Sequence, residues 1–273
     1  MINSVKHAAN SFWQETRFKM SARNAPVFSW YYKYLYQPKK GSIQEFLDLY
    51  SKINQPFTVI QVGANDGITH DLIHKFVKRD QWHGVLLEPQ ARVFERLNHL
   101  YSKDKNIQPV RAALGKETGS TTLYKIGFNN ERWATGLASF RKDVVLSAFE
   151  SGYVGSKMLK TGKALPKNEN EWIAEEEIPV ISPKDIINKY NLNHIHLLQI
   201  DTEGFDDEVV KIFHSQSLLP DAIVLEYVHL GKEREEKCIA LLKESGFRTQ
   251  QFGKDILAVK GDALQVFQQL FKV

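Results

Sequence analysis

Cysteine and long apolar runs are scarce in this sequence. The chain of 273 residues has one cysteine, Cys238, which excludes an internal disulfide and makes a reducing, cytoplasmic setting the expectation. No apolar run approaches the roughly 20 residues that a helix needs to cross a bilayer, and the first residues lack the apolar core of a signal peptide. With 42% apolar and 25% charged residues, we expect one large globular domain, or one domain with an appendage.

Excess charge is missing from most of the chain. The formal net charge is +4, but residues 1–40 alone carry seven lysines and arginines against one acid, which leaves −2 for the remainder. Nucleic-acid-binding proteins are expected to show a broad basic surface. A nearly neutral body therefore predicts no nucleic-acid partner.

Residues 1–40 are rich in aromatic side chains, including the run WYYKYLY from Trp30 to Tyr36. We expect one or two short helices here, which form an extension over residues 1–41 ahead of a main domain at 42–273. Packing against that domain or a second subunit is one interpretation. Contact with a membrane surface or a partner is the other. The pattern sets no oligomeric state.

From Ser42 onward, amphipathic helices alternate with apolar strands. Helices are expected at 42–53, 69–79, 91–103, 206–216 and 233–245, the last with Gly246 as its C-cap. Strands are expected at 57–62, 84–89, 107–115, 194–201 and 221–228, followed by a hairpin from 247–252 and 255–260. This order predicts an α/β protein in which a mostly parallel sheet carries helices on both faces.

Residues 116–182 interrupt the alternation. Strands are expected at 120–126 and 176–182, around a stretch rich in glycine and lysine. An insertion of this length is either functional or disordered. We expect a lid that also recognises the substrate.

The stretch VIQVGANDG, residues 59–67, ends a strand in a tight polar turn. Gly63 and Gly67 can take positive φ and allow a ligand close to the backbone, and Asn65 tolerates the same conformation. The next helix is expected to begin by residues 69–71, with its amides free to donate. Glu88 ends the following strand, where a carboxylate can accept both hydroxyls of a ribose. The sequence thus predicts a nucleoside site.

The phosphate-binding pattern G-x-G-x-x-G is not matched, because the turn reads G-x-N-x-G. Asp66 would repel a pyrophosphate but suits an amino-acid group, with stabilisation of the turn as the alternative. S-adenosylmethionine, a nucleoside without phosphates, fits these residues better than a dinucleotide. An NAD(P)-dependent oxidoreductase would need the third glycine and a hydride-transfer constellation such as Tyr-x-x-x-Lys, so it is the less favoured hypothesis.

The chain resembles the FkbM family of S-adenosylmethionine-dependent methyltransferases. The motifs that carry the resemblance run in family order from about residue 57 to 259: VIQVGANDG, GVLLEPQARVFERL, VRAALG, GLASF, LLQIDTEGFDDEVVK and IVLEYVHL. The resemblance implies a Rossmann-like class I methyltransferase fold with a seven-stranded sheet and a C-terminal antiparallel hairpin. It also implies O-methylation of a hydroxyl on a sugar, glycan or secondary metabolite.

The resemblance assigns the cofactor contacts residue by residue. Gly63, Asn65 and Gly67 form the cofactor loop, Glu88 beside Pro89 holds the ribose, and the strand end at 111–112 approaches the adenine. Many family members have an acidic residue at the position of Gln61. Asp66 is expected to supply the carboxylate that Gln61 lacks. The full set is Gln61, Gly63, Asn65, Asp66, Gly67, Glu88, Pro89, Arg111, Ala112 and Asp201.

A second polar cluster follows the next two strands. Asp201 and Glu203 stand at a carboxyl end, the edge where open α/β sheets bind ligands. Capping of the next helix is the alternative for Glu203. His229, three residues after Glu226, is the first candidate for general base, followed by Asp201 and Glu203. No metal is expected, although Asp201, Glu226 and His229 could hold a divalent cation.

The methyl acceptor is expected to contact Arg132, Trp133 and Ser139 in the insertion, together with Glu226. Packing within the insertion is the alternative for the first three. A non-catalytic nucleoside-binding or scaffold protein is the other hypothesis for the whole chain. It predicts cofactor binding without turnover.

Overall fold

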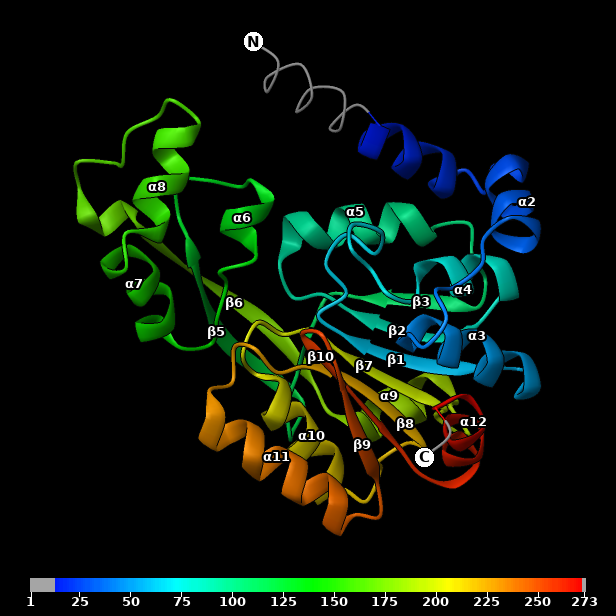
Figure 1. Cartoon of the computed structure of the whole chain (residues 1–273). Helices are drawn as coiled ribbons and strands as arrows, with labels where there is room; N and C mark the ends of the chain where they lie inside the picture. The colour runs from blue at the N-terminus through cyan, green and yellow to red at the C-terminus, as the bar shows by residue number, and fades with distance from the viewer. Residues whose placement is uncertain (1–12, 272–273) are drawn as a thin grey trace.

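A seven-stranded sheet forms the centre of the computed structural model, which describes residues 13–271 apart from the side chain of Arg132 (Figure 1). The strand order is β3-β2-β1-β7-β8-β10-β9. All pairs from β3 to β8 are parallel, and β10 is antiparallel to both β8 and β9. The strands are β1 (Thr58–Val62), β2 (His83–Leu87), β3 (Ile107–Val110), β7 (Leu197–Ile200), β8 (Ala222–Glu226), β9 (Arg248–Phe252) and β10 (Asp255–Val259). The predicted α/β fold, mostly parallel sheet and closing hairpin are confirmed.

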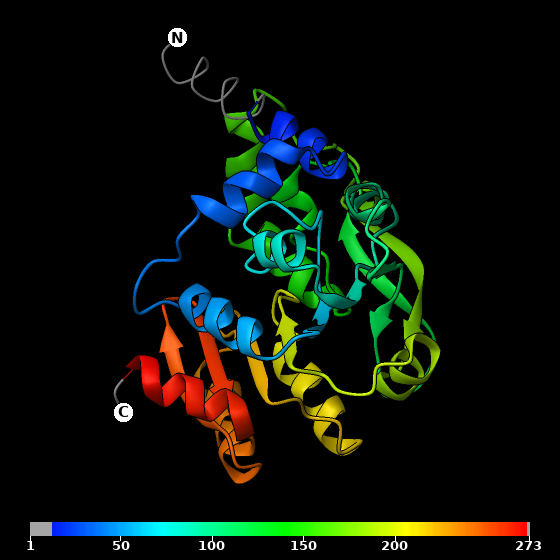
Figure 2. The same ribbon diagram turned by 90° about the vertical axis from the view of Figure 1, so that its right-hand side faces the viewer.

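Helices cover both faces of this sheet because the central strands are apolar on both sides. In β1, Val59 belongs to one core and Ile60 to the other. The first core includes α3 (Ile43–Ile53), α4 (His74–Asp80), α5 (Ala91–Tyr101) and α12 (Gly261–Phe271), of which α3 and α12 lie side by side in Figure 2. The second includes α9 (Pro183–Tyr190), α10 (Asp206–Ser215) and α11 (Lys232–Glu244).

The helix after the first strand begins later than predicted. It starts at His74 rather than by residues 69–71, because two aspartates take the amides before it. Asp66 Oδ1 accepts from the amides of residues 68 and 69, and Asp71 Oδ1 accepts from those of residues 73 and 74. The expected free amides at 69–71 are therefore wrong in part, since the first of them is already bonded.

The predicted strand at 107–115 is two strands in two sheets. β3 ends at Val110, and β4 (Ala113–Leu114) joins β5 (Gly119–Ile126) and β6 (Ile173–Ile181) in a three-stranded sheet. The insertion adds α6 (Arg132–Thr135), α7 (Lys142–Glu150), α8 (Tyr153–Lys160) and the 3₁₀ helix η1 (Glu169–Glu171), with an apolar cluster of its own. Figure 1 shows this unit beside the carboxyl ends of β1 and β2. Its action as a lid stays a prediction.

The N-terminal extension is helical at residues 13–22 and in α2 (Pro26–Tyr34), while residues 1–12 lie outside the described part. Phe18 is buried, with the Arg96 guanidinium 4.2 Å from its ring centre. Lys78 Nζ donates to Asn24 Oδ1 at 2.8 Å and pairs with Asp104 Oδ2 at 2.5 Å. These contacts fasten the extension to α4 and α5. No helix within residues 13–271 is long and apolar enough to span a membrane.

The Lys78–Asp104 pair should matter for stability because both side chains are only 6% exposed. Asp104→Ala leaves a buried ammonium without its carboxylate, so we expect a loss of about 3–5 kcal/mol in the free energy of unfolding, measured by urea denaturation. Glu233→Ala, which breaks an exposed pair with Lys237, is the control and should change little. Equal effects of the two substitutions would contradict the prediction.

Candidate functional site

A cavity opens where β1, β2, β3 and β7 end. The segments that follow these strands form its floor, and residues 135–140 of the insertion form part of its wall. Eight of the predicted site residues line it: Gly63, Asn65, Glu88, Pro89, Ala112, Ser139, Asp201 and Glu203. The strand ends thus bring together side chains that are up to 140 residues apart in the sequence.

Gly63 is the residue that this crevice requires most strictly. Its φ is +82°, and a Cβ there would lie 1.9 Å from the carbonyl oxygen of Asp201. The amides of Gly63 and Ala64 both donate to the Leu87 carbonyl, at 3.1 and 2.9 Å. The chain therefore turns off β1 in contact with both neighbouring strand ends, and no larger residue fits.

Glu88 binds the turn to the end of β2. Its Oε2 accepts from the Asn65 amide at 3.0 Å and its Oε1 from the Gln90 amide at 2.9 Å. The side chain is buried, and this burial raises the pKa of Glu88 to about 7 in spite of the two amides. Because each carboxylate oxygen has two lone pairs, both still have capacity to accept a ribose hydroxyl.

The two other polar residues of the turn act away from the main cavity. Asp66 accepts from the Thr69 amide at 2.8 Å and from the Thr69 hydroxyl at 2.7 Å, which favours the turn-stabilising alternative. It lines a neighbouring cavity with Gln14 and Phe18 of the extension. Gln61 is buried and donates to Asp71 Oδ2 at 2.7 Å. Burial raises the pKa of Asp71 to about 6.

Gly67 serves the packing of the loop. A Cβ at this position would lie 2.6 Å from the Leu97 side chain and 2.9 Å from the Tyr101 ring, both on α5. The Tyr101 hydroxyl donates to the Gly67 carbonyl at 3.3 Å. The second glycine therefore lets the loop lie close against α5, and it does not line the cavity.

Two more predicted contacts, Arg111 and Trp133, lie off the cavity. Arg111 is 40% exposed and pairs with Glu176 of β6 at 2.7 Å, and it does not line the cavity. Trp133 donates from Nε1 to Glu131 at 3.1 Å and packs against the insertion's own apolar cluster. Only the backbone of Arg132 is described. Ser139, the third insertion residue predicted to contact the acceptor, lines the cavity.

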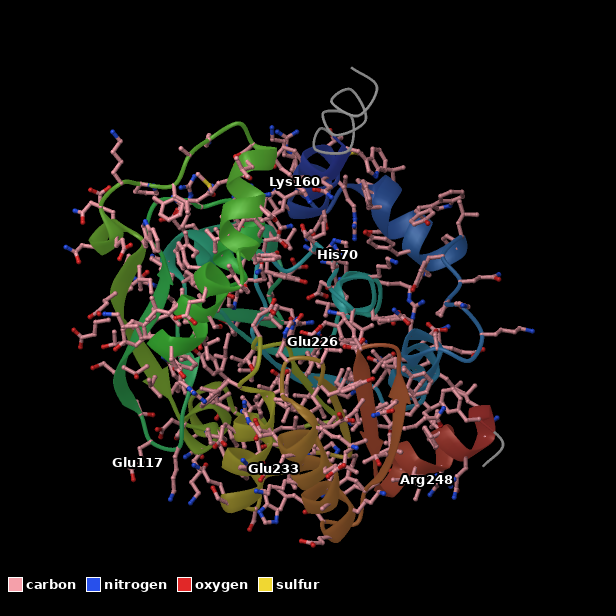
Figure 3. All side chains as sticks on the ribbon, turned by 60° about the vertical axis from the view of Figure 1, so that its left-hand side comes forward. His70, Glu117, Lys160, Glu226, Glu233 and Arg248 are labelled. Atoms are coloured by element: carbon pink, nitrogen blue, oxygen red, sulfur yellow. The ribbon has the colours of Figure 1, made fainter. Side chains whose placement is uncertain are left out.

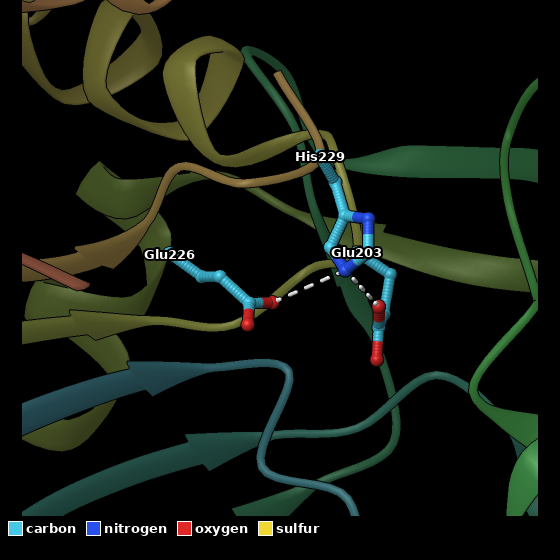
Figure 4. Close-up of side chains that lie close together, drawn as sticks. All are labelled: Glu203, Glu226 and His229. Carbon is cyan, nitrogen blue, oxygen red and sulfur yellow. Dashed lines mark ion pairs between the residues drawn. The ribbon is translucent and has the colours of Figure 1, made fainter. Parts of the chain in front are cut away.

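Glu203, Glu226 and His229 meet at the ends of β7 and β8, as Figure 4 shows. His229 Nε2 lies 3.2 Å from Glu203 Oε2 and 3.8 Å from Glu226 Oε2. Glu226 is buried and also pairs with Lys254 at 2.6 Å. Burial and the neighbouring Asp201 raise the pKa of Glu203 to about 7. The predicted proximity of the two strand ends is present in the structure.

Glu203 is held in an uncommon backbone conformation, with φ at +52°. Outside glycine this region costs about 1–2 kcal/mol, so the surrounding contacts must fix it. Asp206 Oδ2 accepts from the Thr202 hydroxyl at 2.8 Å and the Gly204 amide at 3.2 Å, and Arg234 donates to the Gly204 carbonyl at 3.0 Å. No side chain caps α10 at Phe205, so Glu203 faces His229 instead of the helix end.

The charge of the cavity is one-sided. Glu88, Asp201 and Glu203 line it, and no lysine or arginine does so among the described residues. Carboxylates at close range favour a cationic ligand and oppose an anionic one. The cavity therefore suits a sulfonium and an ammonium group and disfavours a pyrophosphate.

A divalent cation is the other ligand that the Glu203–Glu226–His229 cluster could take. One ligand atom from each residue lies within 4.8 Å of the others. The sequence predicted Asp201 as the third ligand with Glu226 and His229, whereas the structure brings Glu203 to them. Carboxylate and imidazole donors are compatible with several divalent metals, so an experiment must separate a cation from a proton here.

Sequence reasoning missed two residues that join the insertion to the strand ends. The Gln90 side chain donates from Nε2 to the Thr135 carbonyl at 3.0 Å, and both residues line the cavity. Gln90 directly follows the predicted Glu88-Pro89 pair, and Thr135 directly precedes the motif GLASF. Proximity to these two motifs was the available signal.

This sheet order, with a glycine turn after β1 and an acid after β2, defines a class I methyltransferase fold. The family model for the methyltransferase FkbM domain matches residues 61–249. The chain therefore belongs to the FkbM methyltransferase family, and S-adenosylmethionine is its cofactor. No curated protein sequence matches the chain.

The chain is also similar to solved structures at low sequence identity. A methyltransferase FkbM from Methylobacillus flagellatus is 12% identical with a TM-score of 0.46, over 92% of this chain and 60% of that one. An Aeropyrum pernix fibrillarin, in complex with natively bound S-adenosylmethionine, is 9% identical with a TM-score of 0.36, over 76% and 66%. This chain thus spans less than two thirds of the Methylobacillus protein.

The raised pKa of Glu88 predicts a pH dependence of cofactor binding. At a pH below its pKa of about 7, Glu88 is mostly protonated in the free protein. The ionised form is the better acceptor for two ribose hydroxyls. Affinity for S-adenosylhomocysteine should therefore rise between about pH 6 and pH 8 and then level off. Calorimetry measures this, and Glu88→Gln should bind more weakly with a flatter profile. An unchanged affinity in that variant would remove Glu88 from the site.

Proposed function

We propose that this protein transfers the methyl group of S-adenosylmethionine to a hydroxyl of a small-molecule or glycan acceptor. The observation that carries this proposal is the acidic cavity at the strand ends, which lacks a basic side chain among the residues that line it. The same observation counts against a nicotinamide dinucleotide, whose pyrophosphate would face three carboxylates. We also propose a cytoplasmic setting, which the single buried thiol of Cys238 supports.

The residues that line the cavity suit the chemical groups of the cofactor. Gly63 lines it with backbone alone, and Glu88 offers acceptor lone pairs for the ribose. Asp201 and Glu203 supply negative charge on the side of the cavity next to β8. When bound, S-adenosylmethionine supplies an activated methyl group. Alignment of the acceptor with it is then the largest contribution the protein can make, about 7–11 kcal/mol of the barrier.

His229 is the proposed base for the acceptor hydroxyl. Its Nε2 faces two carboxylates, and a carboxylate can only accept. While Glu203 is ionised, Nε2 carries the hydrogen, which leaves the lone pair on Nδ1 free to take a proton. Figure 4 shows that the second ring nitrogen points away from both glutamates. After proton transfer, Glu203 and Glu226 stabilise the imidazolium of His229. Half of the His229 side chain is exposed, so a substrate can reach it.

Substitution of His229 tests this role. Because a positioned base typically contributes about 10²–10⁴-fold, His229→Ala should lower kcat by that factor and leave S-adenosylhomocysteine affinity unchanged. His194→Ala is the matched control, since His194 is equally exposed and pairs with Asp221 at 3.2 Å at the amino end of β7. Full activity of His229→Ala would eliminate the base. Loss of wild-type activity with a chelator, restored by Mg²⁺, would make the cluster a cation site instead.

A binding panel tests the cofactor class and the non-catalytic alternative. S-adenosylhomocysteine should raise the melting temperature, while NAD and NADP should not. A radiolabelled methyl donor supplied with cell extract should then label an acceptor. Stabilisation by NAD alone would reverse the choice of class, and binding without transfer to any acceptor would favour a scaffold protein.

A further inference from the structure

Helix α2 presents an apolar stripe to solvent. Val27, Trp30, Tyr31, Tyr34 and Leu35, which we call the α2 stripe, follow the i, i+3, i+4, i+7, i+8 spacing of one helix face. Each is between 44% and 60% exposed. The opposite face is already packed, because Tyr32 is buried against His74. The stripe is therefore a second apolar face, which the core formed by residues 13–271 does not bury.

Basic side chains surround the stripe. Residues 13–40 contain six lysines and arginines and one acid, Glu15, and Arg23, Lys33, Lys39 and Lys40 are exposed. Tryptophan and tyrosine favour the level of lipid headgroups, and lysine and arginine are attracted to anionic lipids. The chemistry of this surface is that of an interfacial helix.

A second surface of the same kind lies in the insertion. In and after α8, Tyr153 and Leu159 are 42% and 79% exposed, and Lys160, Lys163 and Lys167 are exposed beside them. We call these five residues the α8 patch. Figures 1 and 2 place α8, α2 and the helix at 13–22 at the same end of the molecule, and Figure 3 shows Lys160 at that end, above Glu226.

We propose that the α2 stripe and the α8 patch bind the surface of a bilayer that contains anionic lipids. A bilayer can contact two separate patches at one end of the molecule at the same time. A symmetric dimer through α2 would instead bring two positively charged extensions together, which like-charge repulsion opposes. The proposal does not depend on methyl transfer, because its readout is binding to lipid.

Vesicle flotation of the full chain tests the proposal, with vesicles of phosphatidylcholine alone and of equal parts phosphatidylcholine and phosphatidylserine. The protein should float with the mixed vesicles and less with the neutral ones, and added salt should weaken binding. Trp30→Ser/Tyr34→Ser should weaken binding by about tenfold or more, because two rings leave the interface. Lys160→Gln should weaken it about fivefold.

Two variants at other sites serve as matched controls. Ile53→Ser removes an apolar side chain that is 61% exposed on α3, and Lys232→Gln removes a lysine that is 90% exposed on α11. Both should bind vesicles like the wild type. All variants should keep their melting temperature and S-adenosylhomocysteine affinity, so that a lipid effect is separate from folding and from the proposed enzyme function.

Three results would overturn the proposal. One is absence of binding to the mixed vesicles. Another is equal weakening by the control and test variants, which would indicate non-specific adsorption. The third is a concentration-dependent dimer in sedimentation experiments that Trp30→Ser/Tyr34→Ser abolishes, without any flotation, which would assign the stripe to a second copy of the chain.

Discussion

The carboxylate of Glu88 is the interaction on which the site depends. It accepts the amides of Asn65 and Gln90, so one side chain sets the distance between the turn after β1 and the segment after β2. The Gln90 side chain then carries this constraint to Thr135 in the insertion. A buried carboxyl is costly unless its oxygens are bonded, and here the bonded groups are the backbone that must be held. The acid shapes the crevice as well as lining it.

The sequence predicted the elements that local patterns encode. Strand β7 reads LLQI between polar residues, and Gly246 ends α11 with positive φ, so periodicity and a C-cap located both. Contacts over long distances in sequence were not predictable in this way. The start of α4 depends on which amides Asp66 and Asp71 take, and the division of the predicted strand after Val110 depends on the pairing of β4 with β6, more than 60 residues away. Gly63 was identified as a turn residue from the sequence. The Asp201 carbonyl that excludes a Cβ at this position lies beside it only because β1 and β7 are neighbours in the sheet.

The N-terminal extension is connected to the cofactor loop by hydrogen bonds. Its composition, which differs from that of the main domain, does not indicate this connection. Ser21 Oγ lies 3.0 Å from His74 Nε2, His74 Nδ1 lies 3.1 Å from the Tyr101 hydroxyl, and that hydroxyl donates to the Gly67 carbonyl. Burial lowers the pKa of His74, so the ring is neutral and one tautomer satisfies both neighbours. A continuous set of hydrogen bonds thus joins the helix at 13–22 to the loop that forms the cavity.

The cavity and the exposed end of the molecule that carries the extension and α8 have opposite charges. The cavity is lined by three acids, and Lys254 pairs with Glu226 nearby, while the extension and α8 are basic and exposed. An acidic crevice concentrates a cationic cofactor, and a basic exterior faces anionic surfaces. If the signs were exchanged, the crevice would favour phosphates and the exterior would be repelled by anionic lipid. His74 and Tyr101 connect the basic extension by hydrogen bonds to the loop beside the acidic cavity, so the two oppositely charged regions belong to one bonded structure.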